Sequence, residues 1–288
     1  MKGKTCVITG ATSGIGWASA VQLGRLGADL ILTGRDERRG VELIRRLQRD
    51  HACGNAHFMR TDLSVQREVR ELAAAIRSHC ARVDVLINNA GARFDTFRLS
   101  TDNIELTFAT NHLSHFLLTL LLLDKLQAAE SARVITVSSG AHGSARGDFE
   151  RYFRAENYDR KAAYGSSKLA NLMFAYELAR RLRGTKITSN AVDPGGVATN
   201  LGRNNGIMSW IRHIGYHALK RELLSPRKGA ETIVFLASSP AVEGVSGKYF
   251  FRKREIPSSR ISQDAEAAKR FWESSLDMTG LDDPMGPG

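Results

Sequence analysis

The chain has few cysteines. Its 288 residues include three, Cys6, Cys53 and Cys80, at unrelated spacings. This odd number shows neither a disulfide framework nor a metal site. His112 and His115 fall on one expected helix, but no cysteine or carboxylate stands beside them at metal-ligand spacing, so packing or capping is favoured. The sequence predicts no metal centre and fits a reducing, cytoplasmic compartment.

Long hydrophobic runs are also missing. In the middle of the chain, the run from Phe116 to Leu123 lacks charge and histidine but ends at Asp124. It is too short to span a bilayer and is interpreted as a buried helix segment. Strand-like sequence begins by Thr5, which leaves no room for a cleavable signal peptide. We therefore expect no stable membrane insertion.

The chain has fewer acidic than basic residues. The chain has 41 Lys and Arg against 30 Asp and Glu, a formal net charge of +11. A basic surface can attract nucleic acid or an anionic membrane. No aromatic interleaving or binding module accompanies it, so a solvated basic face is favoured over a nucleic-acid partner. A phosphorylated small molecule such as a cofactor would also benefit from this charge.

What the sequence does contain is an alternation of strand and helix patterns. Short apolar strands are expected at 5–10, 29–33, 56–60, 83–87, 133–137, 187–192 and 247–251, with helical periodicity between them. This alternation predicts an α/β fold with a parallel sheet covered on both faces. We expect one Rossmann-type domain over residues 1–281, with a doubly wound, mostly parallel seven-stranded sheet flanked by helices. Residues 282–288 are expected to form a disordered tail.

A glycine-rich turn joins the first expected strand to the first helix. Gly10 permits the turn, Gly14 lets phosphates approach the backbone, and Gly16 allows helix and strand to pack closely. The N-terminal end of a helix at such a turn can hold a pyrophosphate. The turn predicts a dinucleotide site formed by Gly10, Thr12, Ser13, Gly14, Ile15 and Gly16.

The end of the second strand bears on which dinucleotide binds. An acid at this position hydrogen-bonds a free ribose 2′-hydroxyl, whereas an arginine accommodates a 2′-phosphate. Gly34 leaves the acid position empty and Arg35 follows it. Asp36 is the competing acid, but it is better placed to cap the next helix. The sequence therefore favours NADP(H) over NAD(H).

Polar residues also end the third and fourth strands. Asp62, followed by Leu63, either accepts a hydrogen bond from the adenine amino group or caps a helix. Asn88 and Asn89 precede Ala90 and Gly91. Buried amides must be hydrogen-bonded, so the two asparagines are expected to brace the sheet beside the cofactor.

Tyr164 and Lys168 lie four residues apart on an expected helix over 161–183, and so share one of its faces. A free phenol ionises near pH ~10, and a nearby positive charge lowers that value. The pair could therefore transfer a proton near neutral pH. The same spacing also occurs by chance on surface helices, so these two residues alone leave the function open.

Together these motifs occur in one order: Thr9-Gly10, Gly14-Ile15-Gly16, Asn88-Asn89-Ala90-Gly91, Tyr164 with Lys168, and Pro194-Gly195. In this order the chain resembles the short-chain dehydrogenases/reductases from near residue 3 to about residue 252. It looks most similar to the retinol dehydrogenase-like reductases. That likeness rests on the segments 137–142 (VSSGAH), 164–171 (YGSSKLAN) and 246–250 (SGKYF).

The resemblance implies roles for the catalytic residues. Ser139 would hold the substrate oxygen, Ser138 would be its structural neighbour, and Tyr164 would transfer the proton. Lys168 would lower the pKa of Tyr164 and bind the nicotinamide ribose. Asn111 would hold a helix kink and a water linked to Lys168.

It also implies the remaining contacts of the nicotinamide and the substrate. The cofactor would contact Asn89, Ala90, Gly91, Tyr164, Lys168, Pro194, Gly195, Val197 and Thr199, in addition to Arg35, Asp62 and Leu63. Residues 200–224 would form a lid, and their apolar side chains suggest a lipophilic substrate. The segment 140–163 is either part of the substrate wall or a surface excursion.

The sequence therefore predicts NADP(H)-dependent reduction of a lipophilic aldehyde or ketone, or the reverse alcohol oxidation. One alternative is reduction of a conjugated C=C bond on the same fold. Another is a non-catalytic NADP(H)-sensing protein, which would not need Asn111, Ser139, Tyr164 and Lys168 together. Homo-oligomers are common in the family, and the sequence leaves the oligomeric state open.

Overall fold

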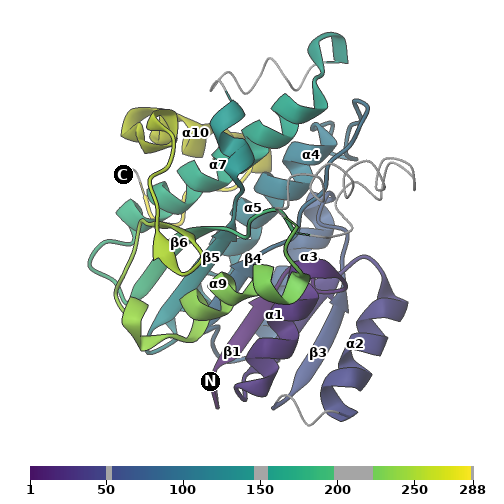
Figure 1. The fold of residues 1–288 in the computed structure, drawn as a ribbon. Coiled ribbons are helices and arrows are strands. Elements are labelled where there is room, and N and C mark those ends of the chain that lie inside the picture. Colours follow the sequence, from purple (N-terminus) through teal and green to yellow (C-terminus); the bar gives the residue numbers. More distant parts are fainter. Residues whose placement is uncertain (50–53, 146–154, 198–222, 287–288) are drawn as a thin grey trace.

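The computed structural model describes residues 1–49, 54–145, 155–197 and 223–286 (Figure 1). They contain one sheet with the strand order β3-β2-β1-β4-β5-β6-β7-β8. Its strands are β1 (Thr5–Ile8), β2 (Asp29–Gly34), β3 (Ala56–Arg60), β4 (Val85–Asn88), β5 (Ala132–Val137), β6 (Ile187–Asp193), β7 (Tyr249–Phe251) and β8 (Arg254–Glu255). β1 to β7 are parallel. The predicted doubly wound, mostly parallel sheet is confirmed.

The sheet has an eighth strand that the sequence did not predict. β8 pairs with β7 in antiparallel fashion across a tight turn. The turn residues Arg252 and Lys253 have φ values of 49° and 64°. Two-residue hairpins require positive φ, which normally selects glycine or asparagine. The turn therefore lacks its usual sequence signature, and the exposed pair Arg254 and Glu255 shows no apolar alternation.

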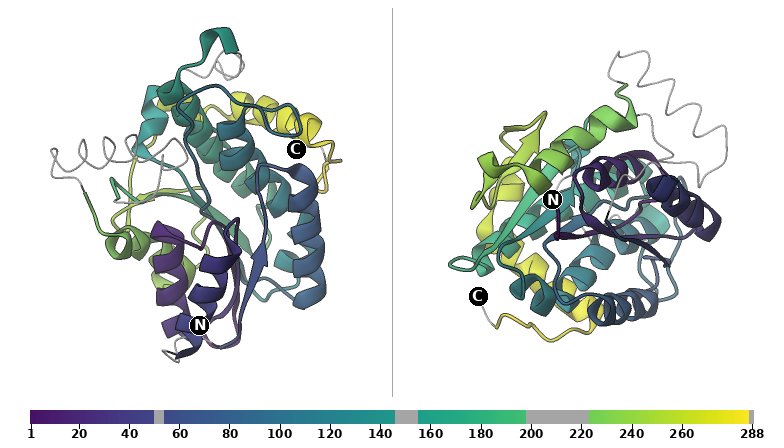
Figure 2. Two further views of the ribbon diagram at one scale, coloured as in Figure 1. Left: turned by 90° about the vertical axis from the view of Figure 1, so that its right-hand side faces the viewer. Right: turned by 90° about the horizontal axis from the view of Figure 1, so that it is seen from below.

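Helices cover both faces of the sheet (Figure 2). Hydrophobic side chains of α1, α2 and α9 pack on one face, and those of α3, α5 and α7 pack on the other, with α10 outside α7. Their bounds are α1 (Gly14–Arg25), α2 (Glu37–Arg49), α3 (Gln66–His79), α4 (Leu106–Phe108), α5 (Ser114–Leu121), α6 (Leu123–Gln127), α7 (Arg160–Arg181), α9 (Pro226–Ser238) and α10 (Ala265–Thr279). A π-helical turn, Ala109–Leu113, joins α4 to α5.

The apolar strand runs follow from this two-sided burial. In β1, Val7 belongs to the core cluster beneath α3 and α5, whereas Cys6 and Ile8 belong to the cluster beneath α1 and α9. Successive side chains of a strand point to opposite faces, so a strand covered on both sides is apolar at every position. The carboxyl ends of these strands then meet at one edge of the sheet.

The direction of chain progression across the sheet reverses beside β1. β1 pairs with β2 on one side and with β4 on the other. In doubly wound sheets, ligands bind outside the carboxyl ends of the strands at this switch point. Among the residues that the structure describes, no helix combines the length and hydrophobicity required to cross a membrane.

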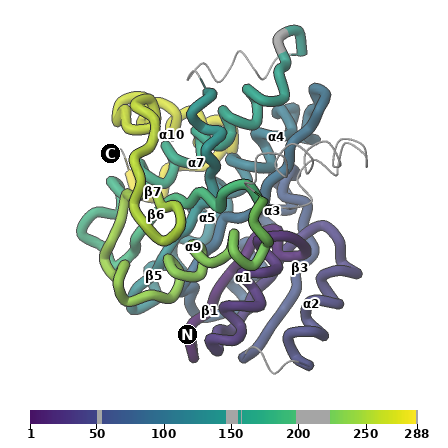
Figure 3. Tube along the Cα trace, viewed as in Figure 1, coloured from purple at the N-terminus to yellow at the C-terminus, as the bar shows by residue number. Residues whose placement is uncertain are grey.

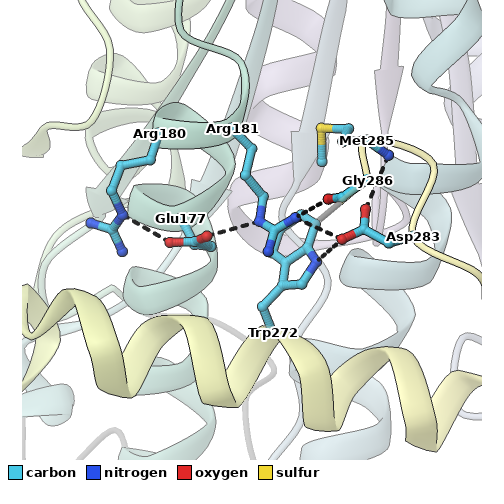
Figure 4. Close-up of polar contacts among 7 residues, drawn as sticks. All are labelled: Glu177, Arg180, Arg181, Trp272, Asp283, Met285 and Gly286. Atoms are coloured by element: carbon cyan, nitrogen blue, oxygen red, sulfur yellow. Dashed lines mark hydrogen bonds and ion pairs between the residues drawn. The ribbon is translucent and has the colours of Figure 1, made fainter. Parts of the chain in front are cut away.

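The end of the chain is fixed on α7 and α10, close to the C label in Figure 3. Asp283 accepts hydrogen bonds from Arg181 Nη1 at 2.6 Å and from Trp272 Nε1 at 3.2 Å (Figure 4). Arg181 Nη1 also donates to the Gly286 carbonyl at 3.0 Å. The disordered tail predicted for 282–288 is therefore wrong for residues 282–286. A single buried cation orders a segment whose composition suggested disorder.

Candidate active site

The glycine-rich turn has the shape that a pyrophosphate site requires. Gly10 and Gly14 have φ values of 65° and 57°. A Cβ at Gly10 would lie 2.8 Å from Ala90 Cα, and one at Gly16 would collide with the Gly10 carbonyl oxygen. Within the described chain the Ser13 side chain makes no capping hydrogen bond to α1, and the first turn of α1 has no acidic residue. The backbone N–H groups there are suited to an anion.

The end of β2 fits a phosphorylated ribose. A Cβ at Gly34 would lie 2.8 Å from Thr12 Cγ2, so a longer acidic side chain would not fit there without movement. Arg35 and Arg39 line the cavity. Asp36 Oδ1 accepts from the Arg39 backbone N–H at 3.1 Å, and its Oδ2 lies 3.2 Å from Arg39 Nε. Asp36 therefore caps α2, as the sequence favoured.

Asp62 has a capping role within its own turn. Its Oδ1 accepts from the Ser64 backbone N–H at 3.0 Å and from Ser64 Oγ at 2.7 Å. Asp62 and Leu63 also line the cavity that contains the glycine-rich turn. The capping is local to this turn, because Val65 rather than Asp62 is the N-cap residue of α3, and a contact of Asp62 with adenine stays a prediction.

Asn88 and Asn89 brace the sheet at the cofactor side. Asn89 Nδ2 donates to the Thr9 carbonyl at 2.7 Å, and its backbone N–H donates to Thr9 Oγ1 at 2.9 Å. Asn88 Nδ2 donates to Thr119 Oγ1 at 2.9 Å. These bonds tie β4 to the end of β1 and to α5. The predicted bracing role is confirmed.

Asn111 lies in the π-helical turn and is fully buried. Its Oδ1 accepts from the Ala92 N–H at 2.7 Å, while its Nδ2 donates to the Ala92 carbonyl at 2.9 Å and to Ser167 Oγ at 3.0 Å. The side chain thus joins the loop after β4 to α7. The expected helix irregularity at Asn111 is present as a π-turn, and π-turns are frequent at functional sites.

Ser139 and Tyr164 meet at the carboxyl edge of the sheet. β5 ends at Val137, so Ser139 follows it by two residues, and Tyr164 comes from the second turn of α7. Both side chains line the same cavity, and Ser139 lies close enough to the phenol to lower the pKa of Tyr164. Ser138 instead donates to the Lys168 carbonyl at 2.7 Å and holds β5 against α7. Ser138 thus has the structural role that the resemblance implied, and the role of Ser139 toward the substrate stays a prediction.

Lys168 is buried one helical turn beyond Tyr164. Its Nζ donates to the Val137 carbonyl at 3.0 Å and lies 5.7 Å from the centroid of the Tyr164 ring. A Cβ added at Gly91 would lie 3.5 Å from Lys168 Nζ and 3.7 Å from Asn111 Oδ1. Lys168 and Asn111 therefore border the same point of the loop after β4.

Burial controls the titration of both residues. Desolvation raises the pKa of Tyr164 to about 12, although the Arg93 charge and the Ser139 hydrogen bond act in the opposite direction. Desolvation lowers the pKa of Lys168 to about 8, opposed by Asp193. The prediction that Lys168 brings the pKa of Tyr164 down to the neutral range is not met in this arrangement, because burial outweighs the attraction of nearby cations.

One cavity of about 1570 Å³ brings the predicted site together. Of the predicted residues, Gly10, Thr12, Ser13, Gly14, Ile15, Gly16, Arg35, Asp62, Leu63, Asn89, Ala90, Gly91, Ser139, Tyr164, Lys168, Pro194, Gly195 and Val197 line it. Asn111 lies behind the wall. Thr199 and most of the expected lid at 200–224 lie outside the described residues. Gly140, Ala141 and Ser144 line the cavity, so this part of the segment 140–163 belongs to the wall.

Six charged residues of the cavity wall were missed from the sequence: Arg39, Arg93, Arg160, Lys161, Asp193 and Arg252. Apart from Arg252, their positions in the sequence, close to residues predicted for the site, could have indicated them. Arg93 follows Gly91 by two residues at the same sheet edge, and Arg160 precedes Tyr164 by one helical turn. Asp193 ends β6 and caps the next turn, where its Oδ1 accepts from the Gly195 N–H at 2.8 Å.

The fold and this site define an oxidoreductase of a known family. A family model described as short chain dehydrogenase matches residues 4–209. The chain therefore belongs to the short-chain dehydrogenase family, whose chemistry is hydride transfer with a nicotinamide cofactor. The expectation drawn from the glycine-rich turn and the Tyr164–Lys168 pair is confirmed at this level.

Within the family the chain is most similar to retinol dehydrogenase-like proteins. Retinol dehydrogenase 14 of Mus musculus is 38% identical over 291 residues, which cover 98% of this chain and 87% of that relative. Retinol dehydrogenase 13 of Homo sapiens is 37% identical, and the alignment covers 98% of this chain and 86% of that relative. Polyprenol dehydrogenase of Mus musculus is 37% identical, covering 96% of this chain and 84% of its own.

Solved structures agree with this assignment. An uncharacterised protein from Mycobacterium paratuberculosis superposes with a TM-score of 0.77 at 32% identity, covering 98% of this chain and 96% of its own. The RhlG/NADP active-site complex of Pseudomonas aeruginosa gives a TM-score of 0.70 at 26% identity, covering 87% and 94%.

Proposed function

We propose that the protein is an NADP(H)-dependent oxidoreductase that interconverts a lipophilic aldehyde or ketone and the corresponding alcohol. The observation that carries the proposal is that Ser139, Tyr164 and Lys168 line the same cavity as the glycine-rich turn. The nicotinamide supplies hydride in reduction and accepts it in oxidation, and the protein orients the reactants and moves the proton.

The proton step follows from the titration of Tyr164. With a pKa raised to about 12, the phenol is protonated at neutral pH and can donate to a substrate oxygen during reduction. Ser139 Oγ would hold that oxygen. Asn111 and Lys168 both border Gly91, which supports a proton relay through a water behind the phenol. Oxidation needs the phenolate instead, so its rate should rise with pH more steeply than that of reduction.

The preference for NADP(H) rests on the end of β2. A side chain at Gly34 would have to displace Thr12, Arg35 and Arg39 line the cavity, and Asp36, which also lines it, is engaged in capping α2. A 2′-phosphate is best met by arginine. RhlG, whose structure is solved with NADP, provides support from a relative of similar fold.

The lipophilic substrate is supported by two observations. Ala92, Ala141 and Leu224 contribute apolar surface to the cavity. Several relatives are named for retinol or polyprenol, which are both long apolar alcohols. The substrate of a relative does not pass directly to this chain, so the proposal is limited to the class of lipophilic carbonyls and alcohols.

The test is a panel of lipophilic aldehydes, ketones and enones, assayed by loss of NADPH absorbance with product identification. Tyr164→Phe keeps the ring but removes the transferable proton, and should lower kcat by about 10²–10⁴-fold while KM changes little. Tyr176→Phe is the matched control, because the Tyr176 hydroxyl lies on the same helix, donates to Ser258 and does not line the cavity. Full turnover by Tyr164→Phe would refute the proposal, and an enone reduced only at C=C would replace carbonyl reduction by the alternative chemistry.

A further inference from the structure

The histidine of the turn after β5 contacts the backbone of Ser139. A 3₁₀ turn, Gly140–Ser144, follows Ser139 directly, and His142 is its buried residue, at 7% exposure. His142 Nδ1 lies 2.8 Å from the Ser139 carbonyl oxygen, which also accepts from the His142 backbone N–H at 3.0 Å. The lining of the cavity, as far as the structure describes it, does not include His142. Any effect of this imidazole on a bound substrate must therefore pass through Ser139 or the turn itself.

The two partners of the ring fix which of its nitrogens carries hydrogen. The Ser259 backbone N–H donates to His142 Nε2 at 3.2 Å. A backbone N–H can only donate and a carbonyl oxygen can only accept. Nε2 must therefore be bare, and Nδ1 must carry the hydrogen that bonds to the Ser139 carbonyl. This tautomer satisfies both ring nitrogens, whereas the other one would set a donor against a donor and an acceptor against an acceptor.

Ser259 and Tyr249 hold the imidazole from its other sides. The Ser259 carbonyl accepts from the N–H of buried Ser262 at 3.0 Å and from its Oγ at 2.6 Å, within the 3₁₀ turn that follows Ser259. The ring of Tyr249 in β7 meets the imidazole edge to face, with centroids 5.4 Å apart. The ring thus ties the end of β5 to Ser259, which lies 117 positions after His142.

The side chain of Ser139 is set by the same turn. Its Oγ accepts from the Ala141 backbone N–H at 3.2 Å and so caps the 3₁₀ turn. A serine hydroxyl has one O–H donor besides its two acceptor sites, so this bond uses an acceptor site and not the hydrogen. Because the carbonyl and the hydroxyl belong to one residue, a shift of the carbonyl also moves the hydroxyl. A displacement of about 1 Å in a group that orients a reactant can cost about 10²-fold in rate.

We propose that His142 is a positioning residue, which as the Nδ1–H tautomer ties the Ser139 carbonyl to Ser259 and so aims the Ser139 hydroxyl at the substrate oxygen. The inference rests on the proposed function, in which Ser139 holds that oxygen, and adds to it a residue from behind the cavity wall. An imidazole suits the task because it is rigid and planar, donates at one nitrogen and accepts at the other.

The test is a double-mutant cycle with Ser139→Ala, assayed with NADPH and the aldehyde of the panel that the wild type reduces fastest. His142→Leu removes both ring contacts, whereas His142→Asn keeps an amide N–H near the place of Nδ1. With Ser139 present, His142→Leu should lower kcat by about 10–10²-fold with little change in KM, and His142→Asn should recover part of the loss. In Ser139→Ala, His142→Leu should lower kcat by less than about twofold, because the hydroxyl that His142 positions is gone.

His57→Leu is the control, since it makes the same substitution at an exposed position away from the cavity and should keep the wild-type kcat. Equal losses from His142→Leu with and without Ser139 would show a general effect on the fold and overturn the inference. An unchanged kcat in His142→Leu would overturn it as well.

A measurement on the wild type keeps the two proposals apart. NMR of the protein with ¹⁵N-labelled histidine and bound NADPH shows which ring nitrogen of His142 carries hydrogen at neutral pH, and His142→Asn identifies the signals by their loss. Hydrogen on Nδ1 with a bare Nε2 supports the inference, and hydrogen on Nε2 overturns it. If no aldehyde of the panel is reduced, the proposed function fails, and this spectrum alone decides whether His142 holds Ser139. It also decides the inference if His142→Leu does not fold.

Discussion

Tyr164 and Lys168 owe their chemistry to where α7 places them. Lys168 is 3% exposed, and its ammonium is held by the Val137 carbonyl, which is a neutral partner. A buried ammonium with one carbonyl partner loses more hydration than it regains. The pKa of Lys168 therefore falls to about 8, and the charge that the site contributes depends on pH near neutrality.

This shift makes a prediction about stability. The pKa of Lys168 falls from 10.5 to about 8 on folding, so between these pH values the unfolded chain binds more protons than the folded one. Stability rises with pH wherever the unfolded state binds more protons. Relative to Lys168→Met, the free energy of unfolding of the wild type should increase by about 2 kcal/mol from pH 8 to pH 10.

The measurement is urea unfolding at several pH values. Lys186→Met removes an exposed lysine and should give a curve parallel to that of the wild type. The comparison cancels Tyr164, which is present in all three proteins. If Lys168→Met also runs parallel to the wild type, the Lys168 ammonium is not desolvated and the proposed role of burial is wrong.

At the residue level, the sequence predicted which groups would meet but not how strongly they would titrate. The helix spacing of Tyr164 and Lys168 and the strand ends at Gly10 and Ser139 were sufficient to gather the site. Arg93 was among the residues missed, because no periodicity places a loop residue relative to a helix distant in sequence. The structure shows that contacts such as Tyr158 with Phe94 make that placement.

At the level of elements, the sequence predicted strands whose side chains are regularly buried. Its periodicity did not predict helix ends or irregularities that a single side-chain contact sets. Strand β2 was predicted as 29–33 and is found at Asp29–Gly34, because its residues from Leu30 onward are buried and form an apolar run bounded by a turn. The helix expected to carry His112 and His115 begins at Leu106, where Glu105 caps it. It then passes through a π-turn because Asn111 bonds to Ala92 and Ser167. Such side-chain bonds leave no periodic trace in the sequence.

The C-terminal segment gives a prediction at this level. Arg181 and Asp283 are 4% and 17% exposed in their side chains, so solvent screens the ion pair only weakly. Asp283→Asn leaves a buried guanidinium with Glu177 as its carboxylate partner. We expect the free energy of unfolding to fall by about 1–3 kcal/mol, with faster proteolysis of the last residues.

The matched control is Asp282→Asn, which makes the same change at the exposed neighbouring position. It should change the free energy of unfolding, measured by urea unfolding, by less than about 0.5 kcal/mol. Equal effects of the two substitutions would mean that net charge, rather than the Arg181–Asp283 pair, governs the segment.

On the scale of the whole molecule, the cavity joins parts of the sheet that are far apart in the sequence. Its wall runs from the turn between β1 and α1 to Arg252 in the hairpin between β7 and β8. A ligand in this cavity would contact both halves of the sheet on either side of the switch point. Binding to the folded state alone adds RT ln(1 + [L]/Kd) to its stability.

NADPH should therefore stabilise the whole chain. The difference between its effect and that of NADH should measure how strongly the site binds the 2′-phosphate of the ribose. At 100 times its Kd the cofactor adds about 2.7 kcal/mol, and should raise the unfolding temperature by several degrees. NADH at the same concentration should raise it less. Arg35→Gln should remove most of the difference between the two cofactors, because it removes the guanidinium proposed to bind the 2′-phosphate, whereas exposed Arg270→Gln should retain it. Thermal unfolding monitored by fluorescence gives both values, and an equal shift with NADH and NADPH in the wild type would contradict the assignment of Arg35.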